Sequence, residues 1–271
     1  MQNLPAHKTP FDTRPHASVS DRGKPLLAVR ALCKTFVCGT PDSLRRIPAL
    51  TDVKLNLSSG EIVALAGLPG SGKTTLLQCV AGLLRRDRGS VEWFGESFPG
   101  GGCLPGLAFV PASPAYYPFL TVRDVLEYRG ARDRPPRDSW GRSIQTLARE
   151  LRLVSCFHRR VSALSDSELA RLALAEALTC EPAIIFVDTR TGAPLGDSAR
   201  EALELRADAG AGIIVAVRDA GLLGSIASRT VIMHEGRVVG TAGEAINDKV
   251  TMPFGEPARE KGRLVAERHV L

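Results

Sequence analysis

The stretch Gly67-Leu68-Pro69-Gly70-Ser71-Gly72-Lys73-Thr74 decides the fold. It satisfies the pattern G-x-x-x-x-G-K-[ST], in which glycines let the backbone close around a polyphosphate with its N–H groups turned inward. The apolar run from Ile62 to Ala66 precedes it and predicts a buried strand, while the apolar spacing from Thr75 to Leu84 predicts a helix. This order places the positive end of the helix at the phosphates. A glycine-rich strand-to-helix turn without a ligand is the alternative interpretation.

Side chains at the end of this loop have specific chemistry. Lys73 would reach the β and γ phosphates of a nucleotide, and the Thr74 hydroxyl would be a ligand of Mg²⁺. Further on, Ala183 to Asp188 is an apolar run that ends in a carboxylate, which in a phosphate-loop protein coordinates Mg²⁺ or orients one of its waters. We therefore predict Thr74 and Asp188 as metal ligands. The predicted nucleotide-binding residues of this region are Gly67, Leu68, Pro69, Gly70, Ser71, Gly72, Lys73, Thr74, Thr75 and Asp188.

The surrounding sequence is typical of an α/β protein, because short β-branched or leucine-rich runs alternate with longer helical segments. Residues from about 121 to 178 look mostly helical with a break at Pro135-Pro136, which suggests an inserted helical subdomain. Gly95 to Gly106 contains five glycines and two prolines and is predicted to be a mobile loop. The expected strands are 26–29, 53–57, 62–66, 91–94, 108–110, 184–187, 213–217, 230–233 and 237–239.

The composition is that of a soluble chain. Its 271 residues are 44% hydrophobic and include 35 Lys+Arg and 29 Asp+Glu, for a formal net charge of +6. Because basic and acidic residues are interspersed, charge gives no reason to expect nucleic acid as a partner. No apolar run approaches the roughly 18 residues that a membrane span needs. The proline-rich residues 1–25 and the residues from 247 to 271 lack a clear period and are predicted to be tails.

Besides the phosphate loop, a set of segments stands in a fixed order along the chain: 32–36, 48–53, 59–63, 117–122, 164–165, 171–178 and 233–238. Taken in this order, they resemble the ATP-binding subunits of ABC transporters over about residues 26–245. The resemblance implies a P-loop NTPase core with an antiparallel β subdomain and a helical subdomain at about residues 112–178, within a domain spanning 26–246. It implies ATP and Mg²⁺ as cofactors, and a second ATP-binding subunit packed head to tail so that each ATP lies between one P-loop and the partner's signature motif.

Residue by residue, the resemblance is incomplete outside the phosphate loop. Phe36 matches the aromatic residue that stacks on adenine, with a core phenylalanine as the alternative. Thr189 stands where the family has the glutamate that polarises the attacking water, and a threonine hydroxyl is not a general base near neutral pH. Arg218 replaces the switch histidine, and Ala112 stands near the position of the switch glutamine. The loop after Asp188 also departs from the family pattern, reading Gly192-Ala193-Pro194-Leu195.

The signature motif, normally Leu-Ser-Gly-Gly-Gln, reads Leu164-Ser165-Asp166-Ser167-Glu168. The family's glycines let backbone amides approach the partner's γ-phosphate, whereas Asp166 would bring a carboxylate near that anion. At an effective dielectric constant near 20 this repulsion costs about 4 kcal/mol at about 4 Å. The same residues form a capping-box pattern, Ser165-x-x-Glu168, that predicts the start of a helix. We expect the helix start to be retained and its contacts with ATP to be lost.

The expected function is that of an ATP-binding subunit that couples nucleotide binding to transport through a membrane permease, with weak or partner-dependent hydrolysis. Its expected location is cytoplasmic, at the inner face of the cell membrane. A nucleotide-gated regulatory or interaction protein outside transport is the alternative, and a P-loop kinase is a third. By resemblance, Tyr116 to Phe119 lies near the groove that receives a permease helix, although a core anchor for the helical subdomain is an equal alternative.

Overall fold

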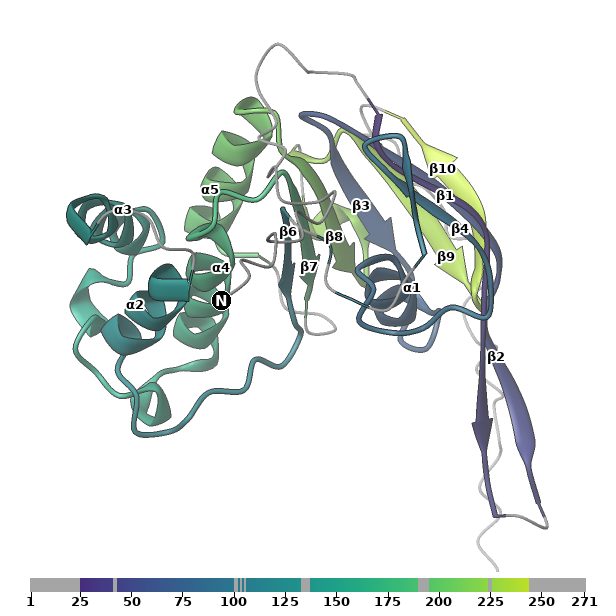
Figure 1. The fold of residues 1–271 in the computed structure, drawn as a ribbon, viewed down its shortest axis with the longest axis horizontal. Coiled ribbons are helices and arrows are strands. Elements are labelled where there is room, and N and C mark those ends of the chain that lie inside the picture. Colours follow the sequence, from purple (N-terminus) through teal and green to yellow (C-terminus); the bar gives the residue numbers. More distant parts are fainter. Residues whose placement is uncertain are drawn as a thin grey trace, which may run out of the picture.

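Two sheets form the body of the protein in the computed structural model (Figure 1), and helices cover the second of them. The structure describes residues 25–40, 43–99, 102, 104, 106–132, 137–189, 195–223 and 226–243. The predicted tails therefore lie outside the described residues, apart from Pro25, which begins the first strand. Among the described residues, no helix has both the length and the apolar character that crossing a membrane requires.

The first sheet is antiparallel, with the strand order β2-β1-β4-β5. Its strands are β1 (Pro25–Cys38), β2 (Arg45–Ser58), β4 (Arg88–Trp93) and β5 (Glu96–Phe98). Strands β1 and β2 continue as a two-stranded ribbon beyond the other strands and project from the body (Figure 1). Short segments of β1, β2 and β4 were predicted from the sequence, but neither the ribbon nor β5 was.

Strand β5 corrects the prediction that all of Gly95 to Gly106 is a mobile loop. Phe94 and Gly95 both have positive φ, 49° and 81°, which is the backbone of a tight two-residue hairpin turn. The turn pairs Trp93 with Glu96 and Val91 with Phe98, whose ring is buried. Burial of this one aromatic side chain holds the start of a glycine-rich segment in the sheet.

The second sheet has the order β10-β9-β3-β8-β7-β6 and is parallel except for β10 at its edge. Every residue of β3 and β7 is buried, as their uninterrupted apolar runs predict for strands covered on both faces. The strands of this sheet are β3 (Ile62–Ala66), β6 (Leu107–Val110), β7 (Ile184–Asp188), β8 (Gly212–Val217), β9 (Arg229–His234) and β10 (Arg237–Ala242).

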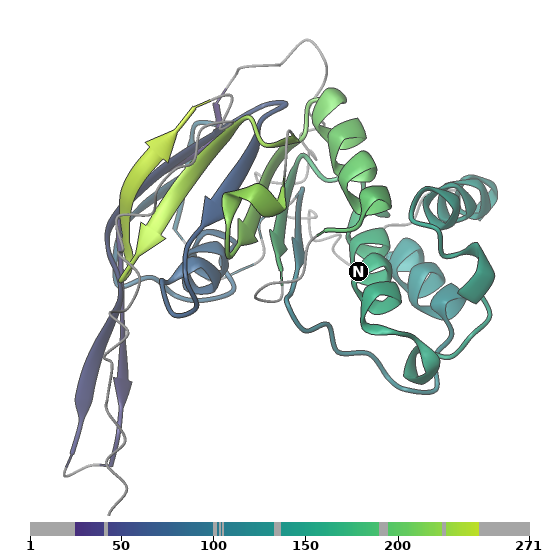
Figure 2. The ribbon, with the colours of Figure 1, turned by 180° about the vertical axis from the view of Figure 1, so that it is seen from behind.

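Three helices gather at one end of the molecule, beyond the second sheet (Figures 1 and 2), and a long unpaired segment leads to them from β6. They are α2 (Val122–Arg132), α3 (Arg137–Glu150) and α4 (Asp166–Leu178). Residues 111–120 are not helical, so the helices begin later than residue 112, and the predicted break at Pro135-Pro136 lies outside the described residues. The other helices in the part of the chain that the structure describes are α1 (Lys73–Val80), α5 (Asp197–Asp208) and the short 3₁₀ turns η2 (Val154–Cys156), η3 (Val161–Ala163) and η4 (Ala220–Leu222).

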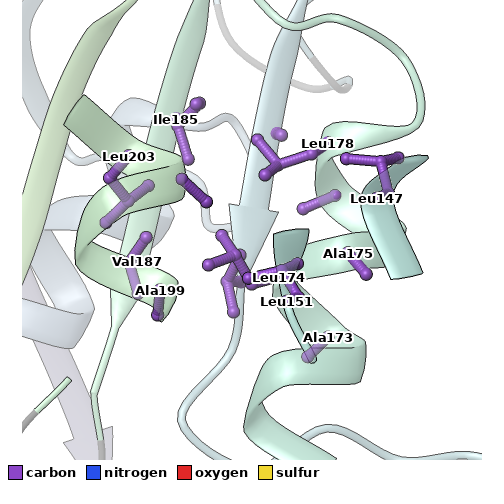
Figure 3. Packing of buried hydrophobic residues seen from close by; sticks show 14 of the residues in the cluster. Leu147, Leu151, Ala173, Leu174, Ala175, Leu178, Ile185, Val187, Ala199 and Leu203 are labelled. Carbon is purple, nitrogen blue, oxygen red and sulfur yellow. The ribbon is translucent and has the colours of Figure 1, made fainter. Parts of the chain in front are cut away.

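The two faces of the second sheet belong to two separate hydrophobic clusters. Side chains alternate along a strand, so Ile185 and Val187 join one cluster while Ile184 and Phe186 join the other. The first cluster packs the sheet against α4 and α5, and it includes Leu178 of α4 and Leu203 of α5 besides Ile185 and Val187 of β7 (Figure 3). The second cluster packs α1 and the antiparallel sheet against the opposite face. The phosphate loop therefore sits on a strand that is held from both sides.

Candidate nucleotide site

The phosphate loop connects the end of β3 to the start of α1, as the sequence predicts. Gly70 and Gly72 have φ values of 82° and 99°, a conformation that favours glycine. Gly72 also lies against β2, since a Cβ added there would stand 2.7 Å from the Ala49 carbonyl oxygen. The Gly236 amide donates to the Ser71 carbonyl at 3.0 Å, which ties the loop to the β9–β10 turn. The loop is thus fixed by its neighbours, and its backbone needs the glycines.

Lys73 points back into the loop that precedes it. Its Nζ donates to the carbonyl oxygens of Gly67 and Leu68, at 2.6 and 3.0 Å, and to the Ser71 hydroxyl at 3.1 Å. Burial lowers the pKa of Lys73, and the negative charge of Asp188 opposes that shift. The ammonium is therefore held inside the loop, where the chain's N–H groups and the start of α1 provide the other positive partial charges for a phosphate.

Asp188 ends β7 and meets the first turn of α1. The Thr74 hydroxyl donates to the Asp188 carboxylate at 2.7 Å, so the two predicted metal ligands are in direct contact. Burial raises the pKa of Asp188, while the Thr74 hydrogen bond and the Lys73 charge lower it in part. A hydroxyl and a carboxylate beside a phosphate loop are oxygen donors of the kind that Mg²⁺ accepts together with phosphate oxygens. The residues fit this ion.

Thr189 follows Asp188 and is bound to the neighbouring strand. Its hydroxyl donates to the Ala216 carbonyl at 2.7 Å, and its backbone N–H donates to the same oxygen at 3.2 Å. The Thr189 side chain thus adds a hydrogen bond between the end of β7 and β8, a structural role that the sequence does not reveal. Arg218 lies just past the end of β8 and is exposed. Because parallel strands end at the same sheet edge, the phosphate loop, Asp188, Thr189 and Arg218 share one edge of the sheet.

Phe36 lies on the projecting β1–β2 ribbon and is 37% exposed, so the alternative of a core phenylalanine is wrong. Its cross-strand neighbour is Ile47, which is also exposed. The Lys34 ammonium lies 5.7 Å from the centre of the Phe36 ring. Two residues past Ile47, β2 reaches Ala49, whose carbonyl oxygen touches the phosphate loop at Gly72. The Phe36 ring therefore offers an apolar surface beside the phosphate loop. Ile47 adds to this surface only because the strand register places it opposite Phe36, and the sequence did not predict it.

The segment in the signature position begins a helix. Ser165 is the N-cap of α4: the Glu168 backbone N–H donates to its hydroxyl at 3.3 Å, and the Ser165 N–H donates to the Glu168 carboxylate at 2.8 Å. The predicted capping box is confirmed. Asp166 and Glu168 both stand in the first turn, where negative charge stabilises a helix but opposes an incoming anion. Arg159 pairs with Glu168 at 3.0 Å.

Ser165→Ala is expected to reduce the free energy of unfolding by about 1 kcal/mol, because the cap bond and its return bond are both disturbed. Urea unfolding measures this loss, with Ser162→Ala, at an exposed serine of η3, as the matched control. Mg-ATP affinity should not change in either variant. Equal stability of the two variants would show that the capping box does not stabilise α4.

Two further positions depart from the family pattern in the sequence. Ala112, after β6, is partly buried and has no polar side-chain atom, and Gly192 to Pro194 lie outside the described residues. The core-anchor interpretation of Tyr116 to Phe119 is confirmed for Tyr116, and the nearby permease groove stays a prediction. Tyr116 packs on the core and donates its hydroxyl to Glu176 at 2.7 Å, whereas Tyr117 and Phe119 are exposed with stacked rings, 5.5 Å between centroids.

In this site a strand, a glycine loop and a helix enclose a lysine, and a threonine–aspartate pair lies at the edge of the parallel sheet. These features define the class of P-loop nucleotide-binding proteins. A family model described as ABC transporter matches residues 50–192. The chain belongs to the ABC transporter family of ATP-binding proteins.

Its relatives include a sulfate/thiosulfate import ATP-binding protein of Mesorhizobium japonicum, 33% identical over 230 residues that cover 80% of this chain and 66% of that protein. A protein of the same description from Caulobacter vibrioides is 32% identical over 259 residues, covering 89% of this chain and 74% of its own length. The chain thus spans about two thirds of the length of the first of these relatives.

Solved structures have the same fold. An ATP-binding subunit of an ABC transporter is 25% identical with a TM-score of 0.66, over 80% of this chain and 90% of that one. A dimeric bacterial ABC transporter cassette is 23% identical with a TM-score of 0.71, over 80% of this chain and 98% of its own. The predicted fold class, a P-loop NTPase core of the α/β type, is confirmed.

Proposed function

We propose that the chain is the ATP-binding subunit of an ABC transporter that binds Mg-ATP at its phosphate loop and hydrolyses it slowly or only with a partner's help. One observation carries this proposal: Lys73, Thr74 and Asp188 are assembled next to Thr189, whose hydroxyl is bonded to the Ala216 carbonyl. These three side chains would bind the nucleotide and its metal ion, and Thr189, at the position where the family has its water-activating glutamate, instead donates a structural hydrogen bond.

Binding follows from the geometry of the loop. The Lys73 ammonium would exchange its bonds to the Gly67 and Leu68 carbonyls for charge-assisted bonds to phosphate oxygens. Thr74 and Asp188 would hold Mg²⁺, which when bound neutralises phosphate charge. Phe36 would stack on the adenine ring from the ribbon beside the loop. The buried charges of Lys73 and Asp188 would thus be paired with phosphate and with Mg²⁺.

Hydrolysis needs a group that orients water and accepts its proton. The Thr189 hydroxyl donates a hydrogen bond to a backbone carbonyl, and the side chain has no basic atom at neutral pH. Arg218 carries a positive charge that suits a phosphate, but a guanidinium does not accept a proton. Asp166 and Glu168 put negative charge at the start of α4, the segment that would face a partner's nucleotide in the family arrangement.

The partners we propose are a transmembrane permease and a second ATP-binding subunit. The family membership supports the first, and the dimeric cassette of the same fold supports the second. A subunit of this kind would lie at the cytoplasmic face of the membrane, held there by the permease. Because this chain supplies neither a catalytic glutamate nor a glycine-lined signature, an intact partner would complete at most part of each shared site.

The transport role is tested by isolating the tagged chain from membranes dissolved in a mild detergent. A multi-spanning membrane protein recovered in stoichiometric amount supports the proposal. A soluble partner whose binding depends on ATP would instead favour a nucleotide-gated regulatory protein outside transport. The matched control is the Lys73→Ala chain, which should retain the membrane partner if docking does not require nucleotide.

A further inference from the structure

The far end of the β1–β2 ribbon has no part in the nucleotide site. Phe36 and Ile47 lie at the base of the ribbon, beside the phosphate loop, and the two strands continue past them. Both views show this end clear of the helices and of the second sheet (Figures 1 and 2). The ribbon tip is defined by residues 37–40 and 43–46. A two-stranded ribbon is marginally stable by itself in water, so a surface that covers the ribbon tip would stabilise it.

The ribbon tip combines exposed apolar side chains with positive charge. Val37 is 58% exposed and Leu44 is 63% exposed. Arg45 and Arg46 are both exposed, and neither forms an ion pair with another described residue. Asp42 is the one acidic residue in the sequence between 36 and 47, and it lies outside the described residues. Two arginines against one aspartate leave this end with a positive charge that suits an anionic partner.

Both faces of the ribbon tip carry an arginine. Successive residues of a strand point to opposite faces, and residues paired across an antiparallel ribbon share a face. The register pairs Val37 with Arg46 and, one step further out, Cys38 with Arg45. Each face therefore presents one arginine beside one small apolar or weakly polar side chain. A flat protein surface would cover one of these faces, whereas the headgroups and acyl chains of a lipid layer can surround both.

We infer that the ribbon tip inserts into the headgroup layer of a membrane that contains anionic lipids. Val37 and Leu44 would reach the boundary with the acyl chains. The guanidinium groups of Arg45 and Arg46 would bind lipid phosphates, each through two N–H groups at once. Their aliphatic stems allow the charges to stay at headgroup level while the apolar neighbours go deeper. This contact goes beyond the proposed function, because it attaches the chain to lipid without the permease.

The test measures how the purified full chain partitions onto lipid vesicles in a sedimentation assay without nucleotide. Vesicles of phosphatidylcholine with about 30% phosphatidylglycerol should bind the chain, and pure phosphatidylcholine vesicles should bind it far more weakly. Binding should also fall as salt is raised, because the attraction to the headgroups is screened. Arg45→Gln combined with Arg46→Gln should weaken binding to the anionic vesicles roughly 25-fold, since each basic residue near such a surface contributes about fivefold.

The apolar contribution is measured separately. Val37→Ser combined with Leu44→Ser should weaken binding to the same vesicles roughly 10-fold, because both side chains lose apolar area that would leave water. Val154→Ser is the matched control, since Val154 is 59% exposed and lies in η2, at the other end of the molecule from the ribbon (Figure 1). It should leave vesicle binding unchanged.

The control for charge is Arg149→Gln combined with Arg152→Gln, two exposed arginines in and just after α3. It removes the same net charge and should leave binding within about 2-fold of wild type, because these residues lie far from the proposed lipid contact. Thermal melting of each variant separates a binding defect from misfolding.

Equal binding to the two kinds of vesicle would overturn the inference, and so would equal losses in the ribbon variants and their controls. A concentration-dependent dimer that Arg45→Gln with Arg46→Gln abolishes would also overturn it, since a second copy would then cover the ribbon tip. The measurement contains neither nucleotide nor permease, so its result is independent of the proposed function.

Discussion

Lys73→Ala is expected to weaken Mg-ATP binding by at least about 100-fold. The Lys73 ammonium is already inside the phosphate loop, with bonds to two carbonyls and one hydroxyl that it can exchange for phosphate oxygens. Two charge-assisted hydrogen bonds of about 1.5–3 kcal/mol each account for a loss of this size.

Thermal or urea unfolding with and without Mg-ATP measures the effect. At a ligand concentration about 100 times the dissociation constant, the wild-type chain should gain about 2.7 kcal/mol of stability, and Lys73→Ala should gain almost none. The control is Lys54→Ala, an exposed lysine on β2. An unchanged affinity in Lys73→Ala would mean that the nucleotide, if bound, is not held by this loop.

Asp188→Asn is expected to have two opposite effects. It should weaken Mg-ATP binding by roughly 10- to 100-fold and remove most of its dependence on Mg²⁺, since one of the two proposed metal ligands loses its charge. It should also stabilise the ligand-free chain at neutral pH. Burial raises the pKa of Asp188, so the ionised form is disfavoured in the folded state, while an asparagine oxygen can still accept the Thr74 hydrogen bond.

The sign of the pH dependence follows from the raised pKa. Between the ordinary aspartate value of about 3.9 and the raised value, the folded chain holds more protons at Asp188 than the unfolded chain does. Raising the pH through this window therefore lowers the free energy of unfolding of wild type relative to that of Asp188→Asn. At pH values above the raised pKa, the difference between the two is constant. Urea unfolding at several pH values measures the gap, with the exposed Asp197→Asn as control. If this difference in the free energy of unfolding shrank as the pH rose, the Lys73 charge would outweigh burial in its effect on the pKa of Asp188.

Local signals in the sequence were enough for the central fold. Strand β3, the glycine loop and α1 follow one another with clear apolar spacing, and β7 and β8 are uninterrupted apolar runs because both of their faces are covered. The capping box at Ser165 needs only two side chains three residues apart, and it formed as predicted.

Features that depend on distant contacts were not predictable in this way. The β1–β2 ribbon continues through exposed residues that pair across the two strands, and β5 depends on burial of Phe98 by sequence-distant neighbours. The Thr189 hydroxyl meets the Ala216 carbonyl because β7 and β8 are adjacent, 27 residues apart in the chain.

The central claim is that this chain binds Mg-ATP without turning it over efficiently by its own residues. Its most direct test measures ATP binding and ATP hydrolysis on one purified sample, with Lys73→Ala beside it. We predict saturable Mg-ATP binding that Lys73→Ala loses, together with phosphate release no faster than in that variant. Turnover of about 1 s⁻¹ or faster, within the ordinary range of enzymes and abolished by Lys73→Ala, would contradict the claim.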